Sequence, residues 1–152
     1  MPTVLITGAG RGLGLELARQ YSADGWQVLA CVRTPQKASE LQALASASAG
    51  RVSAHALDVT DHAAVDALAK SLSETPIDVL LNCAGTMGDG NFAKEGLRFG
   101  AFGTSNFPDW LEIFRLNVLA PMKMAEAFVG HVARSQHKKI VTLTSVLGSM
   151  AT

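Results

Sequence analysis

The fold of this chain is decided by Val4-Leu5-Ile6-Thr7-Gly8-Ala9-Gly10-Arg11-Gly12-Leu13-Gly14, an apolar strand that runs into a glycine-rich turn and then into a helical pattern. Glycine lets the backbone approach a phosphate closely, and the first unpaired N–H groups of a helix point toward negative charge. The glycines are spaced Gly-x3-Gly-x-Gly, which differs from the commoner Gly-x-Gly-x-x-Gly dinucleotide fingerprint. The stretch predicts a turn that binds a diphosphate, and a purely structural glycine turn is the alternative.

The rest of the chain alternates between apolar strand patterns and helical patterns. Strands are predicted at 3–7, 27–32, 51–57, 77–82 and 139–144, and helices at 12–24, at 35–48, from about 61, and at 108–134. Strict alternation of this kind is typical of a parallel sheet with right-handed crossovers. We therefore expect an α/β fold, a Rossmann-type doubly wound parallel sheet with strand order 3-2-1-4-5 and helices on both faces. Residues 1–152 would form a single dinucleotide-binding domain.

Composition narrows the classes of function. The 152 residues are 48% hydrophobic and 17% charged with no net charge, which is typical of a globular domain and leaves no basic stripe for nucleic acid or an anionic membrane. No apolar run is long enough to span a membrane, and no signal peptide pattern precedes the first strand, so we expect a cytoplasmic protein. Cys31 and Cys83 fall on strands separated by the first strand, which predicts reduced thiols. The histidines show no metal-ligand spacing, and no metal site is predicted.

One connection breaks the alternation. Residues 86–107 form a long glycine-rich stretch after the fourth strand, and loops of this length are uncommon inside compact domains. Ligands of open parallel sheets bind at the carboxyl ends of the strands, where this stretch begins. A substrate lid is one interpretation, and a surface excursion or subunit contact is the other.

Five motifs, in order, resemble those of the short-chain dehydrogenase/reductase superfamily, and the resemblance covers the whole chain. Members carry Thr-Gly-x3-Gly-x-Gly, found here at Thr7–Gly14, and an aspartate after the third strand, found as Asp58-Val59. Where members carry Asn-Asn-Ala-Gly, this chain has Asn82-Cys83-Ala84-Gly85, with a cysteine in place of the second asparagine. The long helix carries the matching Asn117, and Ser145-Val146-Leu147-Gly148 matches the serine motif that ends the fifth strand. The Arg-Gly-Leu-Gly turn is also similar to that of sniffer-type and C-factor-like carbonyl reductases.

The resemblance implies that a set of matched residues contacts a nicotinamide dinucleotide. They open the diphosphate turn, hold and cover the adenine, and let the chain pass close to the nicotinamide-side ribose. In that order they are Gly8, Gly12, Leu13 and Gly14; Asp58 and Val59; and Asn82, Ala84 and Gly85. For single residues the plain alternatives are a helix cap at Asp58 and an ordinary turn at Ala84-Gly85.

Charge at the end of the second strand indicates which dinucleotide is preferred. Enzymes that prefer NAD place an acidic residue there for the ribose 2′-hydroxyl, but this chain has Val32 followed by Arg33. Arg11 lies inside the glycine turn. Two guanidinium groups near a 2′-phosphate favour NADP(H) over NAD(H), through charge-assisted hydrogen bonds. Two ordinary surface arginines are the alternative.

Asn117 has a second argument that does not depend on the resemblance. Pro121 follows four residues later and has no N–H to donate to the Asn117 carbonyl. The carbonyl then needs another partner, such as water, and the helix is expected to kink. In the resembled family this carbonyl holds a water of the proton relay, whereas a tolerated proline kink would have no such role.

The resemblance implies that Asn117 and Ser145 take part in catalysis, with Ser145 orienting a substrate carbonyl. The family's acid/base is a tyrosine followed four residues later by a lysine, and no Tyr-x-x-x-Lys occurs here, where Tyr21 is the only tyrosine. We expect an NADP(H)-dependent oxidoreductase that interconverts a carbonyl and an alcohol, of which these residues lack the C-terminal part. The alternative is a non-catalytic dinucleotide-binding sensor or signalling protein. The resemblance also implies a homo-oligomer, a dimer or tetramer.

Overall fold

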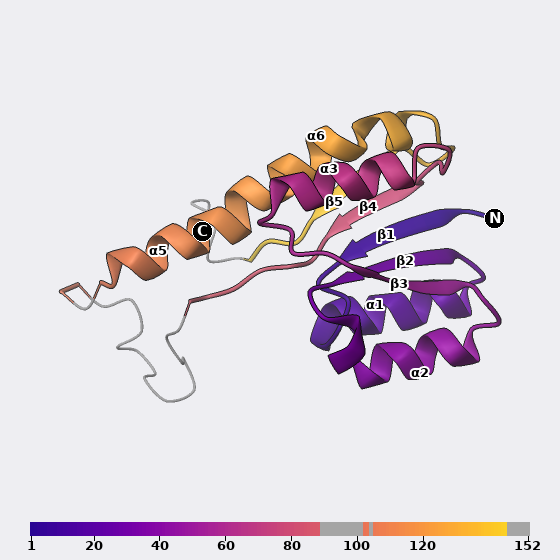
Figure 1. Ribbon diagram of the computed structural model, residues 1–152, viewed down its shortest axis with the longest axis horizontal. Coiled ribbons are helices and arrows are strands. Elements are labelled where there is room, and N and C mark those ends of the chain that lie inside the picture. The colour runs from indigo at the N-terminus through magenta and orange to yellow at the C-terminus, as the bar shows by residue number, and fades with distance from the viewer. Residues whose placement is uncertain (89–101, 104, 146–152) are drawn as a thin grey trace.

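Five parallel strands form one sheet through the middle of the fold (Figure 1). The structure is a computed structural model that describes residues 1–88, 102–103 and 105–145. The strands are β1 (Thr3–Thr7), β2 (Gln27–Val32), β3 (Val52–Ala56), β4 (Val79–Asn82) and β5 (Lys139–Thr142). Their order is β3-β2-β1-β4-β5, which confirms the predicted topology. The predicted connection at 86–107 lies largely outside the described residues.

Helices cover both faces of the sheet, as the alternation predicted (Figure 1). The helices α1 (Gly12–Ala23) and α2 (Ser39–Ala47) lie on one face, and α3 (His62–Ser71) and α6 (Ala120–Ala133) lie on the other. The helix predicted at 35–48 is interrupted, because Pro35–Lys37 forms a separate 3₁₀ turn, η1. In this turn the N–H of Ala38 bonds the Pro35 carbonyl at 3.1 Å, and α2 begins only after it.

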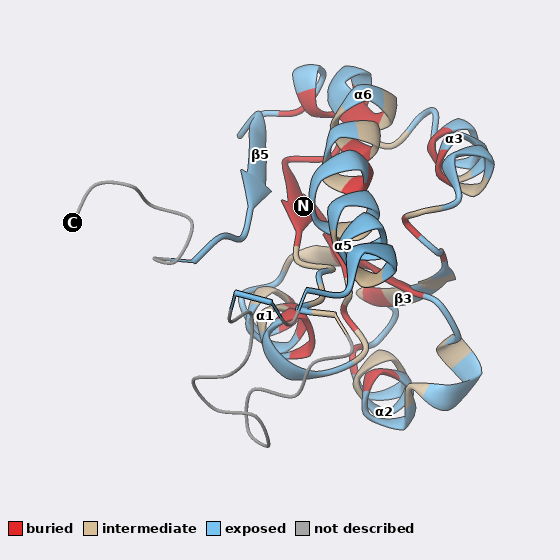
Figure 2. Ribbon diagram, turned by 90° about the vertical axis from the view of Figure 1, so that its left-hand side faces the viewer, coloured by how far each residue is buried: buried red, intermediate tan, exposed pale blue. Residues whose placement is uncertain are grey.

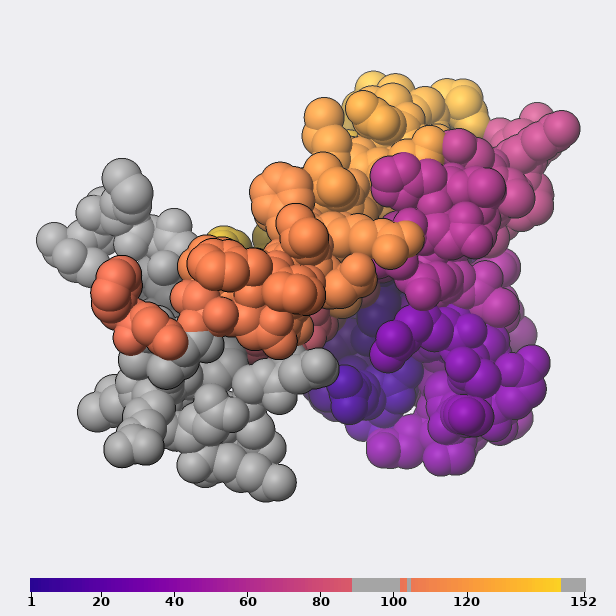
Figure 3. Space-filling model, turned by 60° about the vertical axis from the view of Figure 1, so that its left-hand side comes forward, coloured from indigo at the N-terminus to yellow at the C-terminus, as the bar shows by residue number. Residues whose placement is uncertain are grey.

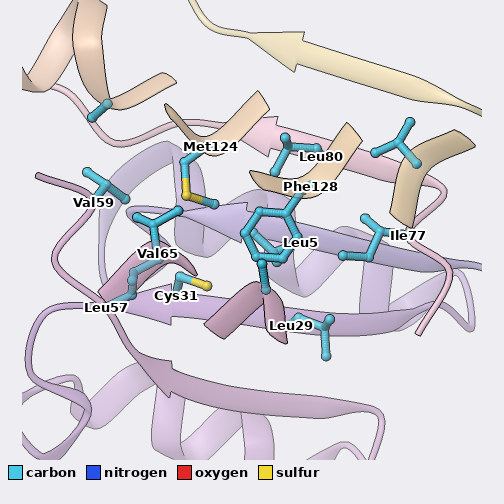
Figure 4. Packing of buried hydrophobic residues seen from close by; sticks show 13 residues of the cluster. Leu5, Leu29, Cys31, Leu57, Val59, Val65, Ile77, Leu80, Met124 and Phe128 are labelled. Carbon is cyan, nitrogen blue, oxygen red and sulfur yellow. The ribbon is translucent and has the colours of Figure 1, made fainter. Parts of the chain in front are cut away.

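The core has two layers because successive strand residues face opposite sides of the sheet. Val4 and Ile6 pack toward α1 and α2, while Leu5 packs toward α3 and α6, and all three are fully buried. On the face covered by α3 and α6, Leu5 belongs to one hydrophobic cluster with Met124 and Phe128 of α6 (Figure 4). Burial on both faces explains why β1 is a continuous apolar run instead of an alternating one.

The long helix predicted at 108–134 is a composite of three hydrogen-bonding patterns. It consists of α5 (Phe107–Phe114), a π-helical segment η3 (Arg115–Leu119) and α6. The N–H of Ala120 bonds the Arg115 carbonyl, five residues back. Pro121 therefore lies in the first turn of α6, where a missing N–H is tolerated. The sequence predicts a kink in the helix near Pro121. The structure has this wider π segment there, and Asn117 lies within it.

The outer part of this composite helix is exposed. α5 extends beyond the carboxyl ends of the strands (Figure 1), and its ribbon is pale blue, for exposed, along most of its length in Figure 2. The edge strand β5 is exposed along its whole length as well. Large apolar side chains at least two-fifths exposed on α5, η3 and α6 are Phe107, Trp110, Leu111, Phe114, Val118, Leu119, Met122 and Val129.

The buried carboxylate of Asp78 joins β1, β4 and β5 at the amino ends of these strands. Asp78, at the start of β4, accepts a hydrogen bond from the Thr3 N–H at 2.9 Å through Oδ2. Its Oδ1 accepts from the backbone N–H groups of Gln136 and His137 at 3.1 Å and contacts the His137 ring at 2.9 Å. Burial alone would raise the pKa of Asp78, but these hydrogen bonds outweigh it and hold the pKa at about 2.

We predict that Asp78→Asn lowers the free energy of unfolding by about 2 kcal/mol near neutral pH, because backbone donors in the interior lose their charged acceptor. The wild-type advantage should be complete above the ordinary aspartate pKa and should vanish as the pH falls toward about 2, since the folded-state pKa is depressed. Urea unfolding across this pH range measures both effects. Asp24→Asn, an exposed aspartate at the end of α1, is the control. Equal stability of wild type and Asp78→Asn would contradict the assignment.

Candidate functional site

A cleft of about 860 Å³ opens at the carboxyl ends of β1, β2 and β4. Here β1 connects toward β2 on one side while β4 lies on its other side, which is the switch point where open α/β sheets bind ligands. In Figure 3 the orange helix α5 overhangs the indigo beginning of the chain on this side of the molecule. Of the residues predicted to bind the cofactor, the cleft is lined by Gly8, Arg11, Gly12, Leu13, Gly14, Arg33, Asp58, Val59, Ala84 and Gly85.

The glycine turn leaves no room for a side chain at Gly8 or Gly14. Gly8 has a left-handed φ of +68°, and a Cβ there would lie 2.8 Å from the Cα of Ala84. A Cβ on Gly14 would lie 2.4 Å from the Gly8 carbonyl oxygen. The turn after β1 therefore packs directly against the turn after β4 and against the start of α1.

The start of α1 has the character of an anion site. Its N-cap residue, Arg11, makes no side-chain capping bond, and the first turn carries no acidic residue. The initial N–H groups of the helix are thus not satisfied by a side-chain cap, and the first residues of the helix line the cleft. Backbone donors in such a place suit a diphosphate.

Thr7 holds the two turns together, a role that the motif reading did not assign. Its hydroxyl oxygen accepts hydrogen bonds from the N–H groups of Cys83 and Ala84, at 3.0 and 3.1 Å. Thr7 is itself almost fully buried. The sequence did carry a sign of this role, because Thr7 is the last residue of an apolar strand, and a buried hydroxyl needs a hydrogen-bond partner.

Asp58 and Val59 follow β3 and form one wall of the cleft. Oδ1 of Asp58 accepts from the N–H and the hydroxyl of Thr60, at 2.9 and 2.7 Å. Burial alone would raise the pKa of Asp58, but these bonds and the charges of Arg33 and Arg115 lower it below its usual value. The carboxylate is therefore ionised, and its second oxygen can accept a further donor such as an amino group. The alternative that Asp58 is a helix cap is excluded, because the side chain that caps α3 is that of Asp61.

Positive charge gathers where β2 ends. Arg11 and Arg33 are both exposed and both line the cleft, as the charge argument required. Lys37, which sequence reasoning missed, lines it as well. It lies in the 3₁₀ turn η1, which bends the chain back beside the cleft instead of continuing into α2. A basic residue four positions after Arg33 was the signal, but the expected regular helix gave no reason to place it there.

Three predicted site residues lie outside the lining of this cleft. Asn82 is buried, and its Nδ2 donates to the Thr142 hydroxyl at 3.4 Å, so it joins β4 to β5. The Asn117 side chain clasps the backbone of Thr86, accepting from its N–H at 2.9 Å and donating to its carbonyl at 2.7 Å. Ser145 is exposed just beyond β5. Their roles toward cofactor and substrate stay predictions, and Val146–Gly148 lies outside the described residues.

Both cysteines are free thiols, as predicted. Burial raises the pKa of Cys31 to about 12 and also raises the pKa of Cys83. Over residues 1–88, 102–103 and 105–145, no three His, Cys, Asp or Glu side chains come together in a way that could hold a metal ion. In the same part of the chain, no helix has both the length and the apolar character needed to cross a bilayer.

The fold and this cleft define an α/β protein with the layout of a dinucleotide-binding domain. The family model for short chain dehydrogenases matches residues 2–152, and the chain belongs to that family. It is 34% identical over 146 residues to a 2-keto-3-deoxy-L-fuconate dehydrogenase of Xanthomonas campestris, covering 96% of this chain and 43% of the relative. The chain spans about half the length of the curated relatives it matches.

Solved structures agree with this assignment. A short-chain dehydrogenase/reductase from Burkholderia multivorans with bound NADP superposes with a TM-score of 0.83 at 30% identity, over 99% of this chain and 61% of that one. A carbonyl reductase from Pseudomonas aeruginosa in complex with NADP gives a TM-score of 0.83 at 29% identity, over 99% and 64%. The resemblance to the sniffer-type subgroup stays a prediction.

We predict that Thr7→Val lowers the free energy of unfolding by about 2 kcal/mol and weakens nucleotide binding, because the Cys83 and Ala84 N–H groups lose their acceptor while the side-chain shape is kept. Thr7→Ser keeps the hydroxyl and serves as the matched variant. Urea denaturation and nucleotide titration of both proteins make the comparison. A loss of stability and binding in Thr7→Ser with none in Thr7→Val would assign the role of Thr7 to its methyl group instead.

Proposed function

We propose that this chain binds NADP(H) in the cleft and forms the nucleotide-binding part of an oxidoreductase that interconverts a carbonyl and an alcohol. The observation that carries the proposal is the joining of three features in one cleft. These are a glycine turn in which a Cβ on Gly8 or Gly14 would clash with neighbouring backbone, an uncapped helix start, and a group of basic side chains. A diphosphate fits the first two, and a ribose 2′-phosphate fits the third.

The preference for NADP(H) over NAD(H) rests on the end of β2. Val32 leaves no carboxylate there to accept from a ribose 2′-hydroxyl, and Arg33 and Lys37 follow within five residues. Arg11 adds a third positive charge across the same opening. Three cations beside one phosphate favour the phosphorylated dinucleotide. The NADP bound by the two solved relatives supports the same choice.

The remaining predicted contacts follow from where each residue lies. The second oxygen of Asp58 would accept a hydrogen bond from the adenine amino group, and buried Val59 would cover the adenine ring. Ala84 and Gly85, on the other side of the glycine turn, would pass close to the nicotinamide-side ribose. Asn82 does not line the cleft and would act indirectly, because its hydrogen bond to Thr142 fixes the end of β4.

The chemistry needs a hydride, which the nicotinamide supplies when it is bound. The Ser145 hydroxyl would donate a hydrogen bond to the substrate carbonyl oxygen, and the main-chain carbonyl of Asn117 would hold a water of the proton relay. Both polar ends of the Asn117 side chain are already engaged with Thr86, which leaves the main chain for this task. Tyr21 packs edge-on against Trp26, 4.9 Å between ring centres, and does not line the cleft. Tyr21 is therefore not a candidate for the acid/base.

We also propose that the protein is a cytoplasmic homo-oligomer, a dimer or tetramer. The support is the row of exposed apolar side chains along α5, η3 and α6, together with the exposed edge strand β5 (Figure 2). Contiguous apolar surface of this kind is typical of a protein interface. Sedimentation velocity tests it, and a monomer at micromolar concentration would overturn it.

We predict that the protein binds NADPH more tightly than NADH, and that Arg33→Ala weakens NADPH binding about tenfold or more while NADH binding changes little, since one charge-assisted hydrogen bond is lost. Nicotinamide fluorescence titration measures both affinities. Lys70→Ala removes a positive charge from the far end of α3 and is the control.

Equal affinity of wild type for NADPH and NADH would refute the assignment to NADP(H). Failure to bind either dinucleotide would refute the proposed function altogether. Oxidation of NADPH by the protein in the presence of aldehydes and ketones would favour a reductase over a non-catalytic sensor.

A further inference from the structure

Arg115 makes a contact that neither the motifs nor the proposed mechanism use. It is the first residue of the π segment η3, and its guanidinium donates to the main-chain carbonyl of Thr60 at 3.3 Å, across 55 residues of sequence. A second guanidinium nitrogen lies 3.8 Å from the Glu112 carboxylate, one turn earlier. Arg115 itself does not line the cleft, so it touches the site only through other residues.

The carbonyl that Arg115 bonds belongs to the turn that would hold the adenine. Thr60 donates two hydrogen bonds to Oδ1 of Asp58, and the three residues Asp58–Thr60 all line the cleft. The positive charge of Arg115 also helps to lower the pKa of Asp58. Arg115 therefore bonds one side of this turn while its charge favours the ionised acceptor on the other.

The other end of the same contact is the segment that carries Asn117. Asn117 lies two residues after Arg115, in the same π segment, and its side chain clasps the backbone of Thr86 after β4. π segments are rare, occur mostly as single turns inside α-helices and are frequent at functional sites. The hydrogen bonds at Thr60 and Thr86 fix this segment to the two walls of the cleft.

We propose that Arg115 is a positioning residue that joins the adenine-side turn to the π segment, so that binding of the adenylyl half of the cofactor holds the helix of Asn117 in place. This inference rests on the proposed function, because it takes the Asp58–Thr60 turn as the adenine site. It assigns to the cofactor a second task, which is to order the part of the site that faces the substrate.

The test uses adenosine 2′,5′-bisphosphate, the half of NADP that lacks the nicotinamide. Binding is measured by calorimetry, and hydrogen exchange of the backbone amides in residues 112–119 is followed with and without the compound. In wild type the compound should slow exchange in this segment. Arg115→Ala should bind it about fivefold more weakly, the loss expected for one hydrogen bond, and should lose the slowing. Arg115→Lys keeps the charge and one donor and should recover part of both.

The chain offers a matched control at the other end of the composite helix. Arg134, just after α6, donates to the main-chain carbonyl of Ser73 at 2.7 Å, which is the same kind of bond on the side away from the cleft. Arg134→Ala should leave both the affinity and the slowing unchanged. Equal effects of Arg115→Ala and Arg134→Ala would show a general loss of structure and overturn the inference.

Two further outcomes separate this inference from the proposed function. If wild type and Arg115→Ala bind the compound equally and protect residues 112–119 equally, the inference is wrong while the cofactor site stands. If wild type binds neither the compound nor NADPH, the proposed function fails and the inference fails with it.

Discussion

The close packing of the turn after β1 against the turn after β4 is the constraint on which the rest of the structure depends. Gly8 lies so near the backbone of Ala84 that no side chain fits between them, and the Thr7 hydroxyl bonds the two N–H groups on the other side of the contact. Because β1 and β4 are neighbours in the sheet, the exits of both strands converge here. The cleft opens beside this contact, between the start of α1, the turn Asp58–Thr60 and the α5 residues Asp109 and Glu112.

Backbone donors, basic side chains and acidic side chains all border the cleft beside this contact. The glycine turn and the helix start offer backbone donors, and the basic side chains that follow β2 border the same opening. Among the acidic side chains of the cleft, Asp58 follows β3, and Asp109 and Glu112 belong to α5. The charge of Arg33 lowers the pKa of Asp58, so a cation and a hydrogen-bond acceptor border the same part of the cleft.

The composite helix connects the cleft with the exposed apolar surface. Its inner half, α6, buries Met124 and Phe128 against the sheet, whereas α5 extends beyond the sheet with much of its apolar surface exposed. The π segment lies at the change between these two environments. Wider helical geometry at this point brings Asn117 and Arg115 to the walls of the cleft without displacing the buried half of the helix.

The sequence by itself determined the parallel sheet, its strand order and the glycine turn, because these follow from local periodicity and from a conformation that only glycine adopts without strain. It also predicted that most of the proposed cofactor residues lie together, and they line one cleft, since the carboxyl ends of parallel strands share one edge. Only the tertiary structure decided the contacts of Thr7 and Arg115, the place of Lys37 beside the cleft and the π form of the long helix. Each of these depends on a partner distant in sequence or on a bend in the chain, and neither leaves a periodic signal among neighbouring residues.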